Sequence, residues 1–323
     1  MRTVCLAAAM SVAFVANVAN VGAAEWNMAT GYGDAFYHTG IVQRFIDDAQ
    51  EISGGSLKIE LHKNQSLVKL PDIKRAVQTE QVQIGEILLS QFGNEDPLYE
   101  LDNVPFFADS FDEAQKLWKV LRPKVDASFA QRGMRVLYIA PWPTSGFYSN
   151  EPIHSVADLE GMKIRVYNDV TRRFFESTGS QPTLVQFSEV PQAFATGLVD
   201  GMFTAPQLCL ALKCWDFVKS FKHVGSHVPT NAVILNESAF MKLSPAEQNA
   251  LIEAGKRADI YAWETARGVT AEQLATLEKN GMNVTEGDEA FVGELRVVGQ
   301  KILDSWLAKA GEDGKAVVAA YRN

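Results

Sequence analysis

One arginine has the type and position that best fit ligand chemistry in this 323-residue chain. In the stretch GMKIRVYN (161–168), Ile164 and Val166 alternate with polar residues, which is typical of a β-strand with one buried face. Arg165 lies in the middle of this strand, and a helical pattern begins at Asp169. Backbone N–H donors of that helix are therefore expected nearby. A guanidinium in such a place matches a carboxylate through two parallel hydrogen bonds.

An alternative for Arg165 is a structural ion pair with an acidic neighbour, Glu160 or Asp169. The surrounding pattern favours the ligand. The strand that carries Arg165 opens a succession of strands and helices, and ligands of open α/β sheets bind outside the carboxyl ends of the parallel strands. Arg165 lies one or two residues from such an end.

Signatures of common enzyme classes are absent from the sequence, which has no G-x-S-x-G, Walker loop, H-E-x-x-H or C-x-x-C. His223 and His227 are four residues apart and would face one metal on a helix, but FKHVGSHVP contains Gly225 and β-type residues. We therefore expect no catalytic residues, no metal and no cofactor. The formal net charge of −9 argues against a nucleic-acid partner, while a local arginine still allows an anionic small ligand.

Residues 1–24 have the features of a cleavable secretory signal. Arg2 precedes an Ala/Val-rich run, and Gly22 and Ala24 are small residues before Glu25. The alternative is an N-terminal membrane anchor, for which the run is short and rich in alanine. A signal peptide implies a periplasmic protein.

Two cysteines remain after such a cleavage, Cys209 and Cys214. In an oxidising compartment they either form a disulfide or stay as two buried thiols. Residues five apart in a continuous helix diverge too far for a relaxed disulfide, so a bond would require a helix break near 210–213. Both alternatives stay open at this point.

Two successions of alternating strands and helices predict two α/β lobes, each with a mainly parallel sheet. The predicted elements are strands at 26–30, 56–63, 82–90, 134–143, 163–167, 182–186 and 199–205, and helices at 39–55, 71–80, 110–121, 170–178 and 189–196. A capping box at Ser244 and Glu247 opens a helical pattern over 243–281. Such a helix exceeds one small lobe, so we expect it to span both.

Several spaced motifs resemble one known family, the DctP-type substrate-binding proteins of TRAP transporters. The likeness in the second half runs from DLEGMKIRV (158–166) through P-x-x-x-x-F-S-E-V (182–190) to A-x-x-T-G-x-V-D-G (193–201). In the first half it includes RFIDDAQEISGGSLKIEL (44–61), the following 64–87, and VPFFADSFDEA (104–114). The resemblance covers most of the chain after the signal, in the right order.

This resemblance implies an extracytoplasmic binding protein with a two-lobed periplasmic-binding-protein fold, a ligand cleft between the lobes and a long helix spanning both. Its members deliver organic acids to a membrane permease pair driven by an ion gradient. The first lobe is predicted as 25–141 plus about 230–268, and the second as 142–229 plus about 269–323. Hinges are expected near 141–143 and 228–231.

The resemblance also implies a set of ligand-binding residues. Arg165 matches the family's carboxylate-binding arginine, Phe187 a cleft aromatic, and Thr204 a position where many members have an asparagine that contacts the ligand. The remaining predicted ligand-binding residues are Trp142, Ser145, Phe203, Glu86 and Tyr167.

Departures from the family pattern suggest the kind of ligand. Phe203 replaces an acidic residue that some members use with a cation, so no metal is expected. Ser145 replaces a second arginine of sialic-acid binders, so a sialic acid is not expected. Trp142, Phe187 and Phe203 predict an apolar cleft around one charged anchor, although each is also compatible with core packing. We therefore predict a monocarboxylate with an apolar or aromatic body. The alternatives are a secreted α/β enzyme that acts on a carboxylic acid and a binding protein that serves a sensor kinase.

Overall fold

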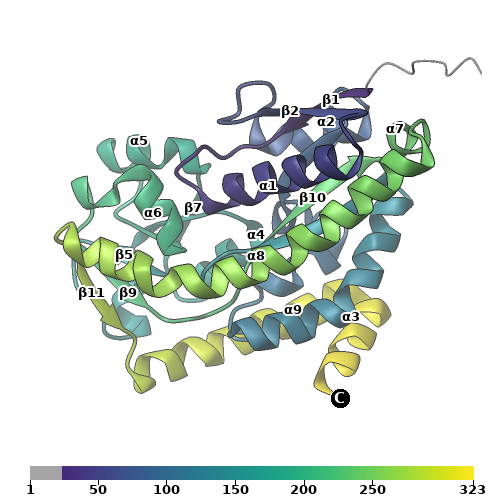
Figure 1. Ribbon diagram of the computed structural model, residues 1–323. Helices are drawn as coiled ribbons and strands as arrows, with labels where there is room; N and C mark the ends of the chain where they lie inside the picture. Colours follow the sequence, from purple (N-terminus) through teal and green to yellow (C-terminus); the bar gives the residue numbers. More distant parts are fainter. Residues whose placement is uncertain (1–23) are drawn as a thin grey trace, which may run out of the picture.

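The computed structural model describes residues 24–323, so residues 1–23 of the predicted signal peptide lie outside it. Two sheets lie side by side with helices around them (Figure 1). The first has the strand order β2-β1-β3-β10-β4 and the second β11-β9-β5-β8-β6-β7. Both are mixed: β2-β1-β3 and β8-β6-β7 are parallel, whereas β10 and β5 run antiparallel to both of their neighbours.

The first sheet consists of β1 (Ala24–Ala29), β2 (Leu57–His62), β3 (Ile84–Leu88), β4 (Met134–Pro141) and β10 (Thr230–Asn236). Its helical elements are α1 (Tyr37–Ile52), η1 (Leu70–Asp72), α2 (Ile73–Gln78), η2 (Leu89–Phe92), η3 (Pro97–Asn103), α3 (Phe111–Ala130) and α7 (Glu237–Met241). Helix α1 shows why the pattern folds this way. Its apolar positions Ile41, Val42, Phe45 and Ile46 recur on one face, and all are buried.

The second sheet consists of β5 (Gly146–Ser149), β6 (Lys163–Val166), β7 (Gln181–Leu184), β8 (Gly201–Thr204), β9 (Ser220–His223) and β11 (Asn283–Glu286). Its helical elements are η4 (Val156–Leu159), α4 (Asp169–Glu176), η5 (Phe187–Glu189), α5 (Val190–Ala195), α6 (Pro206–Leu212) and η6 (Cys214–Asp216). The parallel strand–helix–strand units predicted in both halves of the sequence are thus present.

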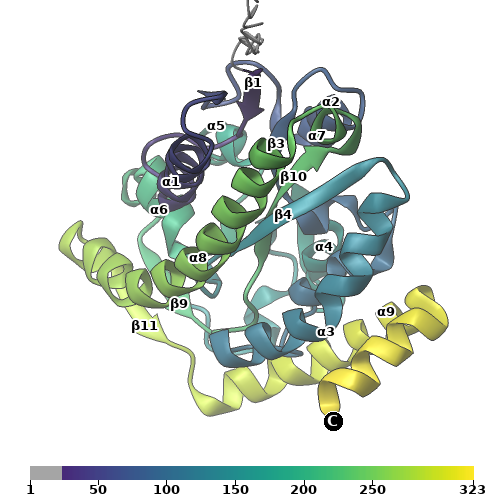
Figure 2. The same cartoon turned by 45° about the vertical axis from the view of Figure 1, so that its right-hand side comes forward.

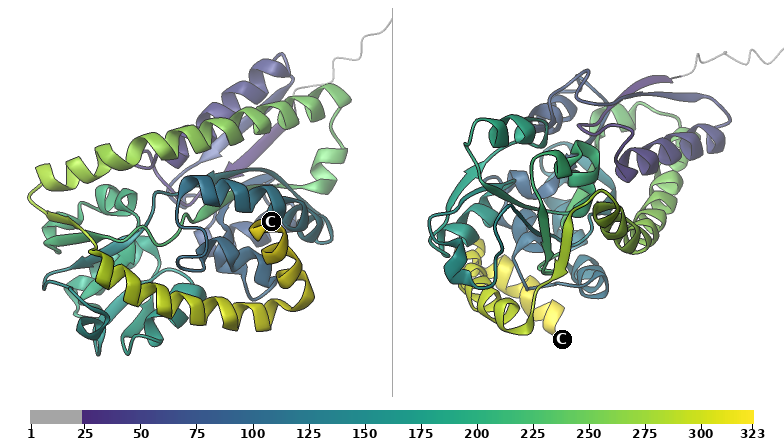
Figure 3. Two further views of the ribbon diagram at one scale, coloured as in Figure 1. Left: turned by 90° about the horizontal axis from the view of Figure 1, so that it is seen from below. Right: turned by 90° about the vertical axis from the view of Figure 1, so that its left-hand side faces the viewer.

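Two long helices complete the fold. Helix α8 (Pro245–Lys279) begins at the predicted capping box of Ser244 and Glu247, and it packs against α1 and β4 at one end and α6 and β11 at the other. It therefore runs past both sheets, as the sequence predicted (Figure 2). Helix α9 (Glu289–Arg322) bends at Gly311 and contacts α3 and η3 as well as α4 and η4. Figure 3 shows α8 and α9 along opposite sides of the molecule.

The chain passes between the two sheets at three places. Residues 142–145 join β4 to β5, residues 224–229 join β9 to β10, and α8 leads from the first sheet to β11 in the second. The first two crossings are short, so the edges of the two sheets that they connect lie close together.

The structure contains elements that the sequence interpretation did not name, the longest of which is α9, and it also differs from that interpretation at α3 and at β10. Helix α3 continues to Ala130 through Pro123, beyond the predicted end at residue 121. A proline inside a helix removes one backbone donor, which is why the pattern predicted an earlier stop. The second difference is strand β10, which inserts between β3 and β4 although its residues follow most of the second sheet in the sequence.

Candidate ligand-binding site

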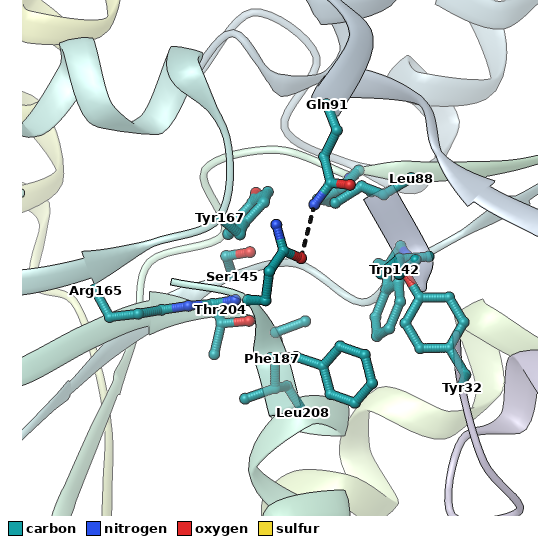
Figure 4. Close-up of a pocket in the computed structure, with 14 residues that line it drawn as sticks. Tyr32, Leu88, Gln91, Trp142, Ser145, Arg165, Tyr167, Phe187, Thr204 and Leu208 are labelled. Carbon is teal, nitrogen blue, oxygen red and sulfur yellow. Dashed lines mark hydrogen bonds between the residues drawn. The ribbon is translucent and has the colours of Figure 1, made fainter. Parts of the chain in front are cut away.

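A cavity of about 470 Å³ lies between the two sheets. Fourteen residues line it (Figure 4). They come from both halves of the chain and from both short crossings: Tyr32, Leu70, Leu88, Gln91, Trp142, Ser145, Arg165, Tyr167, Gln186, Phe187, Thr204, Ala205, Leu208 and Pro229. The lining combines several aromatic rings with a few polar groups and the guanidinium of Arg165, which is typical of a site for a small organic ligand.

The cavity forms where parallel strands end. In the second sheet β7, β6 and β8 are neighbours, and the residues at or just beyond their carboxyl ends line the cavity. In the first sheet the same is true of β1 and β3. Ligands of open α/β sheets bind at this edge, and here the corresponding edges of two sheets face each other.

Arg165 is a buried cation without an acidic partner. Its side chain is only 2% exposed, and its Nε donates to the carbonyl oxygen of Val185 at 2.9 Å. Nη1 has no hydrogen-bond partner among residues 24–323, and no carboxylate there pairs with the guanidinium. Burial lowers the pKa of Arg165 to about 10, so the group is still protonated at neutral pH. The ring of Tyr167 lies 5.7 Å from the guanidinium carbon.

A second polar atom in the cavity also lacks a partner. The hydroxyl of Ser145 is buried and has no partner of good hydrogen-bond geometry within the described chain, although it lies near enough to the hydroxyl of Tyr167 to offset part of the rise that burial causes in the pKa of that tyrosine. The hydroxyl of Tyr167 is by contrast occupied, because it lies 2.7 Å from His227 Nε2 and 3.2 Å from Asn103 Oδ1. Ser145 and Arg165 thus leave donors free toward a cavity that holds few other polar groups.

Aromatic rings form the opposite wall. Phe187 stacks on Tyr32 with ring centroids 5.6 Å apart and an interplanar angle of 30°. Trp142 packs edge-on against Tyr32 at 5.4 Å, and the buried ring of His38 lies 4.0 Å behind Trp142. Burial lowers the pKa of His38 to about 3, so this imidazole is neutral and acts as part of an apolar wall.

Hydrogen bonds join the two halves around the cavity. Gln91 Nε2 after β3 donates to Gln186 Oε1 after β7 at 3.4 Å (Figure 4). Gln186 also lines a second hollow on the other side of this contact, so the two carboxamides separate the cavity from it. Gln207 Nε2 donates to the carbonyl oxygen of Ala35 at 2.7 Å, which adds a further link between the halves.

Six of the eight predicted ligand-binding residues line the cavity, and two do not. Phe203 lies on the other face of β8 from Thr204, in a core with Phe147 and Phe175 at centroid distances of 5.1 and 5.2 Å. The expectation that Phe203 lines the cleft is therefore wrong, because neighbouring residues of a strand point to opposite faces. Glu86 is fully buried behind the aromatic wall and also does not line the cavity.

The expected contribution of the helix after β6 is not met either. The side chain of Asn168 caps α4 by accepting from the backbone N–H of Thr171 at 2.8 Å. No residue of α4 lines the cavity. The arginine side chain, rather than the helix N-terminus, therefore offers the donors.

Sequence reasoning missed several lining residues. Tyr32 and Gln186 lie in loops just after β1 and β7, and Gln91 lies in the short η2 after β3, where no periodic pattern marks them. The general rule on strand ends was the signal that would have indicated them. Leu208 enters from α6, directly beyond the end of β8.

Cys209 and Cys214 are two buried free thiols. The helix break that a disulfide would need is present, since α6 ends at Leu212 and Lys213 has a φ of 52°. The thiol of Cys209 lies 3.8 Å from the sulfur of Met282 and also contacts the thiol of Cys214. The structure therefore has the two-thiol alternative.

Residues 24–323 contain neither a cluster of metal ligands nor a membrane-spanning helix. No group of three His, Cys, Asp or Glu side chains there is arranged to bind a metal ion. No helix in the same range is long and apolar enough to cross a membrane.

Two α/β lobes that enclose a small cavity with one free cation define a two-lobed solute-binding protein. Residues 32–309 match the model of the DctP family, described as bacterial extracellular solute-binding protein, family 7. The chain therefore belongs to this family of extracytoplasmic solute receptors of TRAP transporters, which bind substrates and are not enzymes.

Among solved structures, the chain is similar to DctP7 and DctP6 of Bordetella pertussis, two extracytoplasmic solute receptors binding pyroglutamic acid. For DctP7 the sequence identity is 40% and the TM-score 0.91, with 93% of this chain and 100% of that one covered. For DctP6 the values are 41% and 0.90, with 92% and 99% covered. A curated relative, the sialic acid-binding periplasmic protein SiaP of Vibrio cholerae serotype O1, is 26% identical over 281 residues, which cover 84% of this chain and 81% of SiaP.

Proposed function

We propose that this receptor captures a small monocarboxylate with a compact, largely apolar body and delivers it for uptake. One observation carries the proposal: Arg165 is a buried guanidinium with a free Nη1 and no carboxylate partner in the described chain. An isolated buried charge is strongly unfavourable, so an external anion is expected to complete the pair. A single arginine matches a single carboxylate.

The cavity suggests the role of each lining residue. Arg165 binds the carboxylate, with Ser145 as an additional donor. Tyr32, Trp142 and Phe187 enclose the body of the ligand. Gln91, Gln186 and Thr204 supply carboxamide and hydroxyl groups for its remaining polar atoms.

Pyroglutamic acid is the first ligand to test. It is a monocarboxylate on a five-membered lactam ring, with one N–H donor and one carbonyl acceptor. These groups are complementary to a guanidinium, an aromatic wall and two carboxamides. The two Bordetella receptors that bind it are about 40% identical to this chain. Sialic acid fits the cavity less well, because Ser145 replaces the second arginine.

The ligand is expected to close the two lobes. We propose that 25–141 with about 230–268, and 142–229 with about 269–323, move about hinges near 141–143 and 228–231. Helices α8 and α9 each contact both halves and would flex or slide in this motion. The Gln91–Gln186 and Gln207–Ala35 hydrogen bonds would then form only in the closed receptor.

Export and delivery complete the proposal. The signal peptide of residues 1–24 directs the chain to the periplasm, and the closed receptor transfers its ligand to the membrane permease subunits of a TRAP transporter. A receptor that serves a sensor kinase would have the same cavity, and co-purification with membrane proteins separates the two partners.

Isothermal titration calorimetry with the purified mature protein tests the ligand class. Pyroglutamate, small 2-oxo and hydroxy acids, aromatic acids, C4 dicarboxylates and sialic acid form the panel, and each binder should also raise the melting temperature. Pyroglutamate or another compact monocarboxylate should bind most tightly. Preference for a dicarboxylate or for sialic acid would contradict the proposal, as would turnover of any bound acid.

A further inference from the structure

A fully buried carboxyl group lies directly behind the aromatic wall of the cavity. Glu86 belongs to β3, and its register partner is Val233 of β10. One carboxyl oxygen, Oε2, accepts from the hydroxyl of Thr30 at 2.5 Å. The other, Oε1, accepts from the amide nitrogen of Asn231 at 2.9 Å. The carboxyl group therefore has a donor on each oxygen, and Glu86 does not line the cavity.

The contact with Glu86 determines which way the Asn231 amide points. Because its nitrogen donates to Glu86, its oxygen faces the cavity wall. There Oδ1 accepts from Nε1 of Trp142 at 2.9 Å and lies 3.5 Å from the hydroxyl of Tyr32. A reversed amide would place its NH₂ group against the indole N–H, donor against donor, and would leave both unpaired.

We propose that Glu86 is a positioning residue for ligand binding: through Asn231 it fixes the indole of Trp142 as the wall against which the ligand packs. The inference rests on the proposed function, since it assigns a cause to the shape of that same cavity. The chain of contacts is carboxyl to amide to indole, and each link is a buried hydrogen bond with one permitted orientation. The aromatic wall is thus held by polar contacts from behind, in addition to ring packing.

The positioning role of Glu86 depends on an acceptor oxygen of its carboxyl group and not on a negative charge. Burial raises the pKa of Glu86 to about 7, so both protonation states occur near neutrality. The ionisable groups around it are the hydroxyls of Tyr32, Tyr37 and Tyr138, and burial keeps their pKa values above the usual range, so they are neutral. In either state of Glu86 one oxygen accepts from Asn231, and the Thr30 hydroxyl can rotate to donate or accept.

Two substitutions at Glu86 separate the contribution of an acceptor oxygen from the contribution of a charge. Glu86→Met has a similar length and provides no acceptor, so the Asn231 amide loses the contact that orients it. Glu86→Gln keeps one acceptor oxygen, and its NH₂ group donates to the Thr30 hydroxyl. Glu278→Met, on the exposed side of α8, is the matched control for the change in composition.

Affinity for pyroglutamate is measured by calorimetry, and the indole N–H signals are recorded by ¹H–¹⁵N NMR without ligand. The chain has six tryptophans, and Trp142→Phe assigns the relevant signal. We expect Glu86→Met to weaken binding about 5- to 100-fold, the range for an unsatisfied buried hydrogen bond. It should also shift the Trp142 signal more than the other five. Glu86→Gln should recover most of the lost affinity and the original signal.

Three results would overturn the inference. They are unchanged affinity in Glu86→Met, an unmoved Trp142 signal in that variant, and equal damage from Glu86→Gln, which would make the charge the cause. If Glu86→Met does not fold, Trp142→Phe tests the other end of this series of hydrogen bonds, because phenylalanine keeps an aromatic ring and removes the indole N–H donor. Wild-type affinity in Trp142→Phe would also be contrary to the inference.

Failure of this inference is distinguishable from failure of the proposed function. If wild type binds no acid of the panel, the proposed function is wrong, while the NMR signals of the ligand-free variants still test the contact chain. If wild type binds pyroglutamate and both Glu86 variants bind it equally well, the function stands and the positioning role does not.

Discussion

Two charges are buried in this molecule to almost the same degree, and their surroundings differ. Glu100 in η3 is 1% exposed, and its carboxylate lies 2.9 Å from Arg173 Nη2 and 3.1 Å from Lys309 Nζ. Arg165 is 2% exposed and has no acidic partner in residues 24–323. The first charge joins η3 to α4 and α9, whereas the second lies on the cavity between the sheets.

The difference separates structural charge from functional charge. A buried ion is tolerated when partners and hydrogen bonds compensate for its lost hydration, and Glu100 has both. Arg165 has one hydrogen bond to a backbone carbonyl and an unpartnered Nη1. The chain therefore carries an uncompensated cost at Arg165, which a bound anion can offset.

The largest effect is expected at Arg165 itself. Arg165→Ala should weaken ligand binding by about 2–5 kcal/mol, as for other buried charged pairs. It should leave the melting temperature of the ligand-free protein equal or higher, because it removes an unpaired buried charge. Calorimetry and thermal melts measure the two quantities. Wild-type affinity in Arg165→Ala would show that the cavity does not bind its ligand through this residue.

The opposite result is expected at Glu100. Glu100→Gln removes the charge shared by Arg173 and Lys309 and should lower the free energy of unfolding by about 1–3 kcal/mol. The lower part of this range applies if the partly exposed Lys309 becomes rehydrated. Affinity of the folded protein for its ligand should not change. Urea unfolding and calorimetry test this, and a selective loss of affinity would erase the distinction between the two charges.

A smaller effect is expected at the wall that faces Arg165. Phe187→Ala removes the ring that stacks on Tyr32 and should weaken binding by roughly 1–2 kcal/mol, the loss of one aromatic contact and its buried area. Phe187→Leu, which keeps most of the apolar volume, should lose less. If both variants bind as wild type does, the ligand is held by Arg165 without the wall.

The carboxamide contact between the two halves should contribute least to affinity. Gln91→Ala removes the donor of a long hydrogen bond to Gln186, so we expect a loss of about 0.5–1 kcal/mol. The change should appear as faster release, because in the proposed closure this bond forms only when the lobes are closed. Stopped-flow tryptophan fluorescence measures both rates. A slower association with unchanged release would indicate that Gln91 acts during ligand entry.

Two other buried groups near the crossings give opposite pH effects. Burial raises the pKa of Asp102 to about 7 and lowers that of His227 to about 3. Folded Asp102 binds a proton that the unfolded chain releases above pH 3.8, so its contribution to stability falls as pH rises to about 7. Folded His227 lacks a proton that the unfolded chain binds below pH 6.5, so its contribution falls as pH drops toward 3.

Measurements of the free energy of unfolding from pH 4 to pH 8 should separate the pH effects of Asp102 and His227. Relative to wild type, Asp102→Asn should become progressively more stable as pH rises to about 7, and His227→Gln progressively less stable as pH rises to about 6.5. Curves for both variants that run parallel to that of wild type would mean that neither group has a shifted pKa in the folded protein.

Much of the fold and the main charge of the site could be predicted from the sequence. Strand and helix periods are local, so the parallel units and the full length of α8 were readable from neighbouring residues. Arg165 was indicated because a strand pattern, a helix start and an arginine in the middle of the strand lie within residues 161–169. Phe203 was misplaced although the alternation that puts Thr204 toward the cavity puts Phe203 away from it.

The remaining features depend on contacts between distant segments. Strand β10 pairs with β4 across 88 intervening residues and with β3 across 141. Strands β5 and β9 belong to no consecutive parallel strand–helix–strand unit, which is the pattern that indicated the equally short β6, β7 and β8. Glu86 was predicted to contact the ligand, and nothing in its sequence neighbourhood indicates its actual partner, Asn231. Its partner lies 145 positions away along the chain.

The cavity's location at strand ends has a consequence for evolution. Most of its lining side chains lie at or just beyond the ends of strands, so exchanging them leaves the backbone hydrogen bonds of the two sheets intact. Mutations that change what is recognised therefore keep the framework of the two sheets in place. A gene for such a receptor can be duplicated and diverge toward a new nutrient in single steps, each of which leaves a folded protein for selection to act on.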